Sequence, residues 1–550
     1  MRLPFAAATG ETADEAATGK PSVGDAAQGS AADAAAQDGS SRDDGSRTGG
    51  SSDSGASATP RDVAPAADET LPVSRAAASQ PAAAGPNPSA SSPSEALTVA
   101  APPRSSVTSG CFLASAPDTQ YDALADAIDV AQDGDIVYVV SDNLDAGRRA
   151  VRSDKDLTIT SAAGTCAVKV RFDFAYTQGA KELKLENIAF ETKYDAVLWH
   201  TRTAPLFTID GGSLVMGKDA SVSYANLNIM ERPLADGDGL TCPVRVKKDG
   251  SFTMLEGALL QADSTYAVGG NGSRPVRGAA VYVEHYGIMS MRGGTIAGFA
   301  KYSGNLQGGA IYNAGDIYFE SGVIKDCRAT RGGAVYNDSG TRFRLDDGSF
   351  EDCTADEAGG AICNESGAAS VLRNGAIKRC TSAKGGAVYE GYHVDDSLHN
   401  MEITDCGADE GGAVYSLMEP GITVSSCSIK GCKATSRGGA IVSSGGIKIE
   451  DTSIVNCSAE SGEGGAVWAG PIGVSADWLV DIRHVTISGC SAERGGALYL
   501  VGQNAEVDDI TITDNAAVTA GSAIAMEGSC DLTFSRGTTT ITGNKVSKTS

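Results

Sequence analysis

The sequence predicts an all-β solenoid, a parallel β-helix, and three observations carry this prediction. A phrase of two small residues, an alanine and an aliphatic residue occurs nine times between Gly308 and Ile524, at steps of 24, 27, 26, 26, 27, 26, 31 and 26 residues. Short alternating apolar segments accompany the phrase, without a helical 3.6-residue period. An amphipathic segment precedes the repeats, where a stack needs a cap. A fixed period in this range is typical of repeats that stack only on their neighbours.

Residues 1–110 differ in composition from the rest and are predicted to form a disordered tail rich in Ala, Ser, Gly and Pro. Residues 1–105 contain 11 of the 18 prolines and no cysteine. Such a segment cannot bury enough apolar surface to offset the conformational entropy lost on folding. A plain linker is the simpler interpretation, and a glycosylated flexible spacer is the alternative. The β-helix is assigned to residues 111–550, with well-matched repeats from about residue 296 to 550.

A short capping helix is predicted at the start of the β-helix, because apolar residues recur there at helical spacing. Asp118 is the candidate N-cap, and Gly134 lies just past the predicted end. Segments 134–140 and 156–160 are predicted to be the first strands. The residues on the apolar face are Tyr121, Leu124, Ala125, Ile128 and Ala131. This helix would cover the apolar end of a stack whose first turn has no neighbour.

A second repeated element precedes each glycine phrase. It consists of an aliphatic or aromatic residue, two variable residues, a cysteine, one variable residue and a small residue, as in Ile324–Ala329. Asn515 replaces the cysteine in the last full copy. Seven of the 13 cysteines occupy this position: Cys327, Cys353, Cys380, Cys406, Cys432, Cys457 and Cys490.

These motifs resemble those of known families. The helix followed by GDIVYVV resembles the N-terminal cap of the pectin-lyase-like right-handed parallel β-helix superfamily. The two repeat elements resemble the repeats of polymorphic outer-membrane proteins and of repetitive Gram-positive surface adhesins. The resemblance implies a right-handed parallel β-helix for about residues 120–550, on a fold that supports both enzymes and adhesins. Cysteine stands here at the place of the outer-membrane repeats' asparagine, which only Asn515 and Asn544 keep.

The repeated cysteines are expected to stack into a column about 4.8 Å apart. Side chains that point the same way rarely reach the dihedral of a disulfide, so the prediction is a column of buried, reduced thiols. A bridge within one turn, Cys427 to Cys432 or Cys353 to Cys363, is the alternative. No CxxC pair occurs and no histidine accompanies the column, so we expect neither a metal site nor a cofactor.

Two further columns flank the glycine pair. The residue before the pair is predicted to form an exposed charge ladder whose sign alternates from Lys384 onward, each pair contributing roughly 0–1 kcal/mol. It comprises Arg331, Ala358, Lys384, Glu410, Arg437, Glu463 and Arg494.

The residue that ends the glycine phrase is often aromatic and should point outward, because the aliphatic residue before it points into the core. Such an exposed column could stack on sugar rings or anchor a partner, and stacking of the rings for stability alone is the favoured alternative. The candidate ligand-binding residues are Tyr312, Tyr336, Tyr389, Tyr415, Trp468 and Tyr499.

Candidate catalytic groups concentrate in one segment only. The resemblance implies either the clustered acids and basic proton acceptor of the fold's polysaccharide lyases, or the paired aspartates of its hydrolases, and both require carboxylates that converge on one groove. Segment 390–400 contains the candidates His393, Asp395, Asp396 and His399. An ordinary solvated loop of this composition is the simpler interpretation.

The favoured function is therefore that of a secreted or cell-surface adhesin-like protein whose partners are glycans, extracellular-matrix proteins or other host surface proteins. A polysaccharide lyase or glycoside hydrolase is the first alternative, and a structural stalk of a larger surface protein is the second. The net charge of −25 and the lack of a basic cluster make nucleic acid an unexpected partner. No segment approaches 18 uninterrupted apolar residues, and we expect the start and a C-terminal anchor to lie outside this chain.

Overall fold

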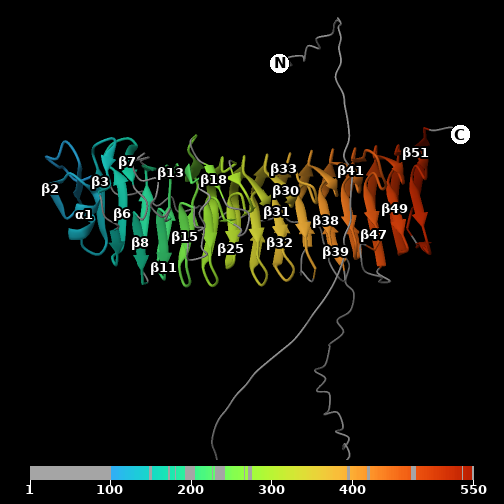
Figure 1. Ribbon diagram of the computed structural model, residues 1–550, viewed down its shortest axis with the longest axis horizontal. Coiled ribbons are helices and arrows are strands. Elements are labelled where there is room, and N and C mark those ends of the chain that lie inside the picture. Colours follow the sequence, from blue (N-terminus) through green and yellow to red (C-terminus); the bar gives the residue numbers. More distant parts are fainter. Residues whose placement is uncertain are drawn as a thin grey trace, which may run out of the picture. The chain divides into compact units, whose positions relative to one another are not determined.

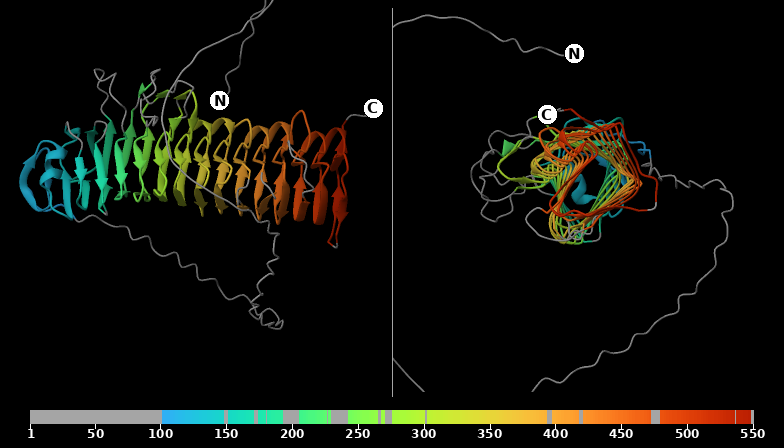
Figure 2. Two further views of the ribbon diagram at one scale, coloured as in Figure 1. Left: turned by 60° about the horizontal axis from the view of Figure 1, so that its bottom comes forward. Right: turned by 90° about the vertical axis from the view of Figure 1, so that its right-hand side faces the viewer.

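The computed structural model describes residues 101–147, 151–170, 174–179, 181–192, 205–225, 227–228, 242–264, 267–269, 276–300, 302–392, 397–417, 421–471, 479–535 and 537–547. The predicted disordered tail lies, up to residue 100, outside the described residues. The described residues beyond the tail form a parallel β-solenoid of about 13 turns, which confirms the predicted all-β fold class (Figure 1). Seen along the stack, successive turns superimpose around one axis (Figure 2).

One wall of the solenoid is a 14-stranded parallel sheet to which each turn contributes one strand. The aliphatic residue of each glycine phrase opens its strand, and equivalent residues pair in register, as Val335 does with Ile362. The strands are β5 (Val151–Ser153), β8 (Ala175–Gln178), β11 (Phe207–Asp210), β15 (Val244–Val246), β20 (Val281–Val283), β24 (Ile311–Asn313), β27 (Val335–Asn337), β31 (Ile362–Asn364), β34 (Val388–Glu390), β38 (Val414–Ser416), β42 (Ile441–Ser443), β46 (Val467–Ala469), β49 (Leu498–Val501) and β52 (Ile524–Glu527).

A 28-stranded sheet bends around the next two faces. In the central turns a residue with positive φ, such as Asn374 at 54° or Asn400 at 52°, separates the two strands of a turn. The well-matched turns contain β21 (Ile288–Ala297), β25 (Asp316–Lys325), β28 (Arg342–Leu345), β29 (Ser349–Glu351), β32 (Ala369–Arg373), β33 (Ala376–Lys378), β35 (Ser397–His399), β36 (Glu402–Thr404), β39 (Gly421–Ser425), β40 (Ser428–Lys430), β43 (Gly446–Glu450), β44 (Ser453–Val455), β47 (Leu479–Ser488), β50 (Asn504–Thr513), β53 (Leu532–Phe534) and β54 (Thr540–Thr542). The preceding turns contain β4 (Leu144–Asp145), β6 (Leu157–Ser161), β7 (Cys166–Val170), β9 (Glu182–Glu186), β10 (Ile188–Thr192), β12 (Ser213–Met216), β13 (Ser221–Tyr224), β16 (Ser251–Met254) and β17 (Leu259–Ala262).

Shorter strands complete the turns on the remaining side. In the turns that contain the repeated cysteine, these strands follow the cysteine and lead toward the glycine pair. Isolated bridges through Thr381 and Lys384 join the four-stranded and six-stranded groups. The three groups are β14 (Leu227–Asn228), β18 (Ala267–Gly269) and β22 (Tyr302–Ser303); β19 (Val276–Arg277), β23 (Leu306–Gln307), β26 (Arg328–Arg331) and β30 (Thr354–Ala358); and β37 (Gly407–Glu410), β41 (Lys433–Arg437), β45 (Ser458–Ala459), β48 (Ser491–Arg494), β51 (Ala516–Ala520) and β55 (Lys545–Val546).

The N-terminal end of the stack is closed by the predicted helix and by a change of strand direction. Helix α1 (Leu124–Val130) buries Leu124, Ala125, Ala127 and Ile128. Strand β1 (Cys111–Leu113) pairs antiparallel with both β2 (Ala116–Tyr121) and β3 (Asp135–Val139), so it ends the parallel ladder. The predicted N-cap is wrong, because Asp118 lies in β2 and accepts hydrogen bonds from Ser106, while Ala123 occupies the cap position. In the described part of the chain no helix is long and apolar enough to cross a membrane.

The glycine phrase has a steric explanation. The first glycine has a positive φ, 65° at Gly385 and 66° at Gly411, which places it in the left-handed region. The second glycine faces the carbonyl oxygen of its counterpart in the next turn, and a Cβ at Gly412 would collide with the Gly439 oxygen. The last phrase has Ser522 as its second residue, and the described structure has no further turn against this position. Close stacking of the turns therefore requires the glycine pair.

Candidate functional site

The predicted aromatic column lies on the middle residue of the strands in the 14-stranded sheet. Its members pair in register, as Tyr312 does with Tyr336 and Tyr389 with Tyr415. The rings of each pair stack, with centroids 5.3 Å and 5.6 Å apart. Cys363 separates the two pairs, and Val442 separates Tyr415 from Trp468. The sequence thus placed the column correctly in the fold.

The expected exposure of this column is wrong. Tyr415 is 1% exposed, Tyr312 and Tyr499 are each 2%, and Trp468 is 5%. Tyr389 is only partly buried. The rings point away from the core, as strand alternation requires, but other side chains cover them. Whether the column contributes to ligand binding stays a prediction.

Cations from the charge ladder provide this cover. Lys384 Nζ lies 5.0 Å from the Tyr415 ring centroid, and the Arg437 guanidinium lies 4.7 Å from that of Trp468. Arg494 lies 5.1 Å from the ring centroid of Tyr499. Such contacts contribute about 0.5–1 kcal/mol at exposed sites and about 2 kcal/mol when desolvated. The ladder and the aromatic column thus form one surface, which we call the cation–aromatic strip.

Ion pairs between turns hold the cations of this strip in place. Arg437 Nη2 lies 2.7 Å from Glu410 Oε1, and Arg494 Nη2 lies 2.6 Å from Glu463 Oε1. The predicted alternation of sign is therefore confirmed at these rungs. The expected exposure of the ladder is wrong here, because the side chains of Glu410 and Arg437 are 19% and 29% exposed. Arg437 and Arg494 each have two roles, since each pairs with an acid of the turn before and covers a ring.

Carboxylates complete the strip at the tyrosine hydroxyls. Tyr336 donates to Glu365 Oε1 at 3.0 Å, while Tyr312 donates to Asp338 and Tyr499 to Glu527. Burial, followed by the hydrogen bond to Glu527, raises the pKa of Tyr499 to about 12. Burial likewise raises the pKa of Tyr389 to about 12. The tyrosines are therefore neutral donors at physiological pH, which suits a structural role.

The structure describes only part of the candidate catalytic segment. His399 ends β35 on an exposed face, and its Nδ1 lies 2.9 Å from Ser425 Oγ in the next turn. His393, Asp395 and Asp396 lie outside the described residues. Glu390 opens the segment but is fully buried and accepts a hydrogen bond from Asn364 at 2.9 Å.

That hydrogen bond ends an asparagine ladder, which sequence reasoning missed. Asn313 Nδ2 donates to Asn337 Oδ1 at 2.9 Å, and Asn337 Nδ2 donates to Asn364 Oδ1 at 2.6 Å. All three side chains are fully buried. Each asparagine directly follows the outward residue of its strand, so strand alternation alone would have placed it inside. The ladder satisfies buried amides across successive turns.

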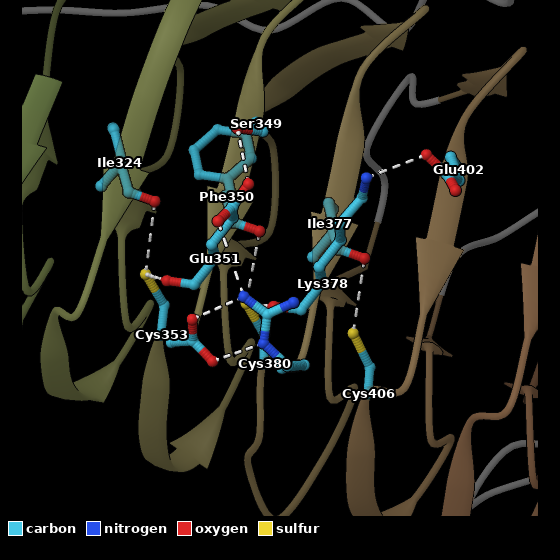
Figure 3. A network of polar contacts seen from close by, with 12 residues as sticks. Ile324, Ser349, Phe350, Glu351, Cys353, Ile377, Lys378, Cys380, Glu402 and Cys406 are labelled. Atoms are coloured by element: carbon cyan, nitrogen blue, oxygen red, sulfur yellow. Dashed lines mark hydrogen bonds and ion pairs between the residues drawn. The ribbon is translucent and has the colours of Figure 1, made fainter.

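The cysteine column lies inside the solenoid, as predicted. All 13 cysteines are free thiols in this structure, and the seven of the column are at most 1% exposed. Figure 3 shows Cys353 Sγ close to the carbonyl oxygens of Glu351, at 3.4 Å, and Ile324, at 3.8 Å. Burial raises the pKa of the Cys353 thiol well above its ordinary value. The Cys353 thiol is therefore protonated and donates to backbone carbonyls.

In the turn after Cys490, Asn515 takes the place of the column cysteine and makes equivalent contacts with the backbone. Asn515 Nδ2 donates to the Ile487 carbonyl at 3.1 Å, and its Oδ1 accepts from Cys490 N at 2.8 Å. The thiols of Cys380 and Cys406 likewise donate to the carbonyl of the aliphatic or aromatic residue one turn before, at 3.8 Å and 3.7 Å. Cysteine thus substitutes for asparagine as a small buried donor.

Within the described residues no group of three or more His, Cys, Asp or Glu side chains is arranged to hold a metal ion. No protein-family model, curated protein or solved structure matches this chain.

Proposed function

We propose that this chain is a non-enzymatic, adhesin-like protein, secreted or attached to a bacterial surface, that presents its β-helix to ligands on host or neighbouring cells. The observation that carries the proposal is the alignment of outward side chains in rows across successive turns. One row of the 28-stranded sheet runs through Ser213, Ser251, Ile288, Asp316, Arg342 and Ala369. Because neighbouring strands lie about 4.8 Å apart, such rows present many side chains at regular spacing.

The interior supports this proposal, since it keeps those rows in fixed positions. The asparagine ladder and the cysteine column connect successive turns inside the solenoid. A preorganised surface loses less conformational entropy when it binds than a flexible surface does. Weak contacts spread over many turns can then add up to useful affinity.

A structural stalk is the second candidate, and the cation–aromatic strip favours it. Its ion pairs and its stacked ring pairs join one turn to another, which strengthens the stack lengthwise. A lyase or hydrolase remains the alternative for segment 390–400, where His399 is exposed beside Ser425.

One paired experiment separates the three functions. The full chain is applied to arrays of glycans and extracellular-matrix proteins, and in parallel to acidic polysaccharides with detection of reducing and unsaturated ends. Saturable binding without release of ends supports the proposal. Release of ends that is lost in His399→Ala contradicts it and favours the enzyme. Absence of both binding and release favours the stalk.

A further inference from the structure

The seven thiols of the cysteine column form one unbroken row along the solenoid. They occupy the same repeat position in seven successive turns, from Cys327 to Cys490. The same backbone hydrogen bond joins each cysteine to the next turn, as Thr354 N donates to Cys327 O at 2.9 Å. Each thiol therefore stands beside the next, and Figure 3 shows Cys353 and Cys406 pointing the same way.

The spacing and surroundings of these thiols are regular. Neighbouring thiols are close enough to act as hydrogen-bond partners for one another at all six steps of the column. Parallel strands lie about 4.8 Å apart, and equivalent side chains keep that spacing. Apolar side chains that are fully buried, such as Ile377 and Ile403, precede the cysteines by three residues. The column is thus a row of evenly spaced sulfur atoms in an apolar interior.

The fold does not require sulfur at this position. Asn515 occupies it one turn after Cys490, where its Nδ2 donates to the Ile487 carbonyl at 3.1 Å and to Asn544 Oδ1 at 3.0 Å. Asparagine thus satisfies the packing and the hydrogen bonds of the column. Cysteine nevertheless holds seven successive places. Affinity for soft metal ions is a property that a row of thiols has and a row of asparagines lacks.

We infer that the cysteine column binds soft monovalent metal ions, copper(I) or silver(I), each held between the thiolates of two successive turns. Such ions accept two thiolates on opposite sides as a complete set of ligands. Metal–thiolate bonds are about 2.3 Å long, so an ion midway between two sulfurs spans about 4.6 Å, close to the strand spacing. Side chains stand roughly perpendicular to a sheet, so the ion meets each Cβ–Sγ bond at roughly a right angle. This inference is independent of the proposed function.

Charge balance favours a monovalent ion. Each ion replaces one thiol proton, so seven thiols and six ions give seven sulfurs, six ions and one remaining proton, with six protons released and no electron transferred. The filled column carries no net charge, which matters because an unpaired charge in an apolar interior is costly.

Metal ions that need more ligands do not fit this column. In the part of the chain that the structure describes, no three His, Cys, Asp or Glu side chains are arranged around a common metal position. Zinc, which takes four ligands in structural sites, therefore has no site there. The missing CxxC pair and histidine argued against a metal of that kind, and a site with two thiolates needs neither.

The test counts the metal ions bound by the reduced full chain, handled without oxygen, by native mass spectrometry. Copper(I) is supplied from a competing chelator and silver(I) as a simple salt. Both are added to the folded protein and, in parallel, during refolding, because the column thiols are at most 1% exposed. Thermal unfolding followed by circular dichroism is measured with and without metal.

Three variants separate the column from the other thiols. Cys406→Asn interrupts the column in its middle, and Cys490→Asn shortens it at one end. Both keep a buried donor of the kind that Asn515 supplies. Cys242→Ala is the matched control, because it removes a buried free thiol outside the column. Circular dichroism of the metal-free variants checks their folding, and Cys406→Ser takes the place of Cys406→Asn if the latter does not fold.

We expect the wild type to bind about six ions. Cys406→Asn should bind two fewer, because an internal cysteine takes part in two steps of the column. Cys490→Asn should bind one fewer, and Cys242→Ala should bind as many as the wild type. Bound ions should also raise the unfolding midpoint of the wild type, because they bind the folded chain and link its turns.

A wild type that binds neither copper(I) nor silver(I), even after refolding with the metal, would overturn the inference and leave the column a structural feature. A loss of one ion in each of the three variants would also overturn it, because the thiols would then bind ions independently of one another. Either result would leave the proposed function intact, since that function rests on the outward rows of side chains.

Discussion

The second glycine of the repeated phrase offers the sharpest test of how the turns stack, and Gly412→Ala is the decisive substitution. A Cβ at this position would overlap the Gly439 carbonyl oxygen and lie 2.7 Å from Lys433 N. Both atoms belong to the backbone of the next turn, so no side-chain rotation can relieve the contact. The turns must separate locally, which lengthens bonds such as Ala413 N to Ala440 O, now 2.8 Å.

The magnitude follows from these contacts. Overpacking of a tight site costs about 1–3 kcal/mol. Each weakened backbone hydrogen bond adds about 1 kcal/mol. We therefore expect Gly412→Ala to lower the free energy of unfolding by about 3 kcal/mol. Hydrogen exchange should locate the loss in the turns around Gly412 and Gly439, because each repeat contacts only its neighbours.

Gly407→Ala is the matched control five residues earlier. A Cβ there would have Thr381 Cγ2 at 3.7 Å and Lys433 O at 3.9 Å, which are ordinary contacts. The alanine should raise stability by about 0.4–1 kcal/mol, because it restricts the unfolded chain. Thermal and denaturant unfolding by circular dichroism, with hydrogen exchange, measures both variants. If the two variants proved equally stable, the steric explanation of the glycine phrase would be refuted.

Three further predictions concern the strip, the thiols and the asparagine ladder. Arg437→Ala removes the cation that covers Trp468 and the ion pair with Glu410, so it should destabilise the fold by about 1–2 kcal/mol. It should also increase acrylamide quenching of Trp468, measured in a background where the other two tryptophans are phenylalanine. Arg342→Ala is the control, because the Arg342 side chain is 74% exposed, and it should change neither the stability nor the quenching. Burial raises the pKa of the Cys427 thiol from 9.0 to about 11, so the protonated thiol contributes its full stability below pH 9 and loses that contribution as the pH rises toward 11. Between pH 9 and pH 11 the unfolding midpoint of Cys427→Ala should therefore fall less steeply with pH than that of the wild type. Parallel slopes of midpoint against pH would contradict this assignment. Asn337→Leu removes one acceptor of the Asn313 Nδ2 group and the donor to Asn364 Oδ1, so we expect a loss of about 2–4 kcal/mol in denaturant unfolding. Asn504→Leu, whose side chain is exposed on β50, should cause little change.

Part of the candidate site could be predicted from the sequence because it depends on local rules. Strand alternation places Tyr336 outward and Val335 inward, and it would have placed Asn337 inward as well. The residue before the column cysteine was read as variable, yet it takes a positive φ, as Asp352 does at 55° and Asn456 at 55°. The frequency of Asp, Asn and Gly at that place was a usable signal that the pattern contained.

The sequence by itself determined the solenoid, its period, the capping helix and the register of each column, because these follow from spacing and local backbone preference. Only the tertiary structure decided which columns lie against one another. The cations before the glycine pair cover the aromatic rings because the chain turns sharply at that pair, and Arg437 thereby reaches Trp468 in the following turn. Alternation along a strand separates inside from outside, but it carries no information about the side chains that other segments lay over the outer face.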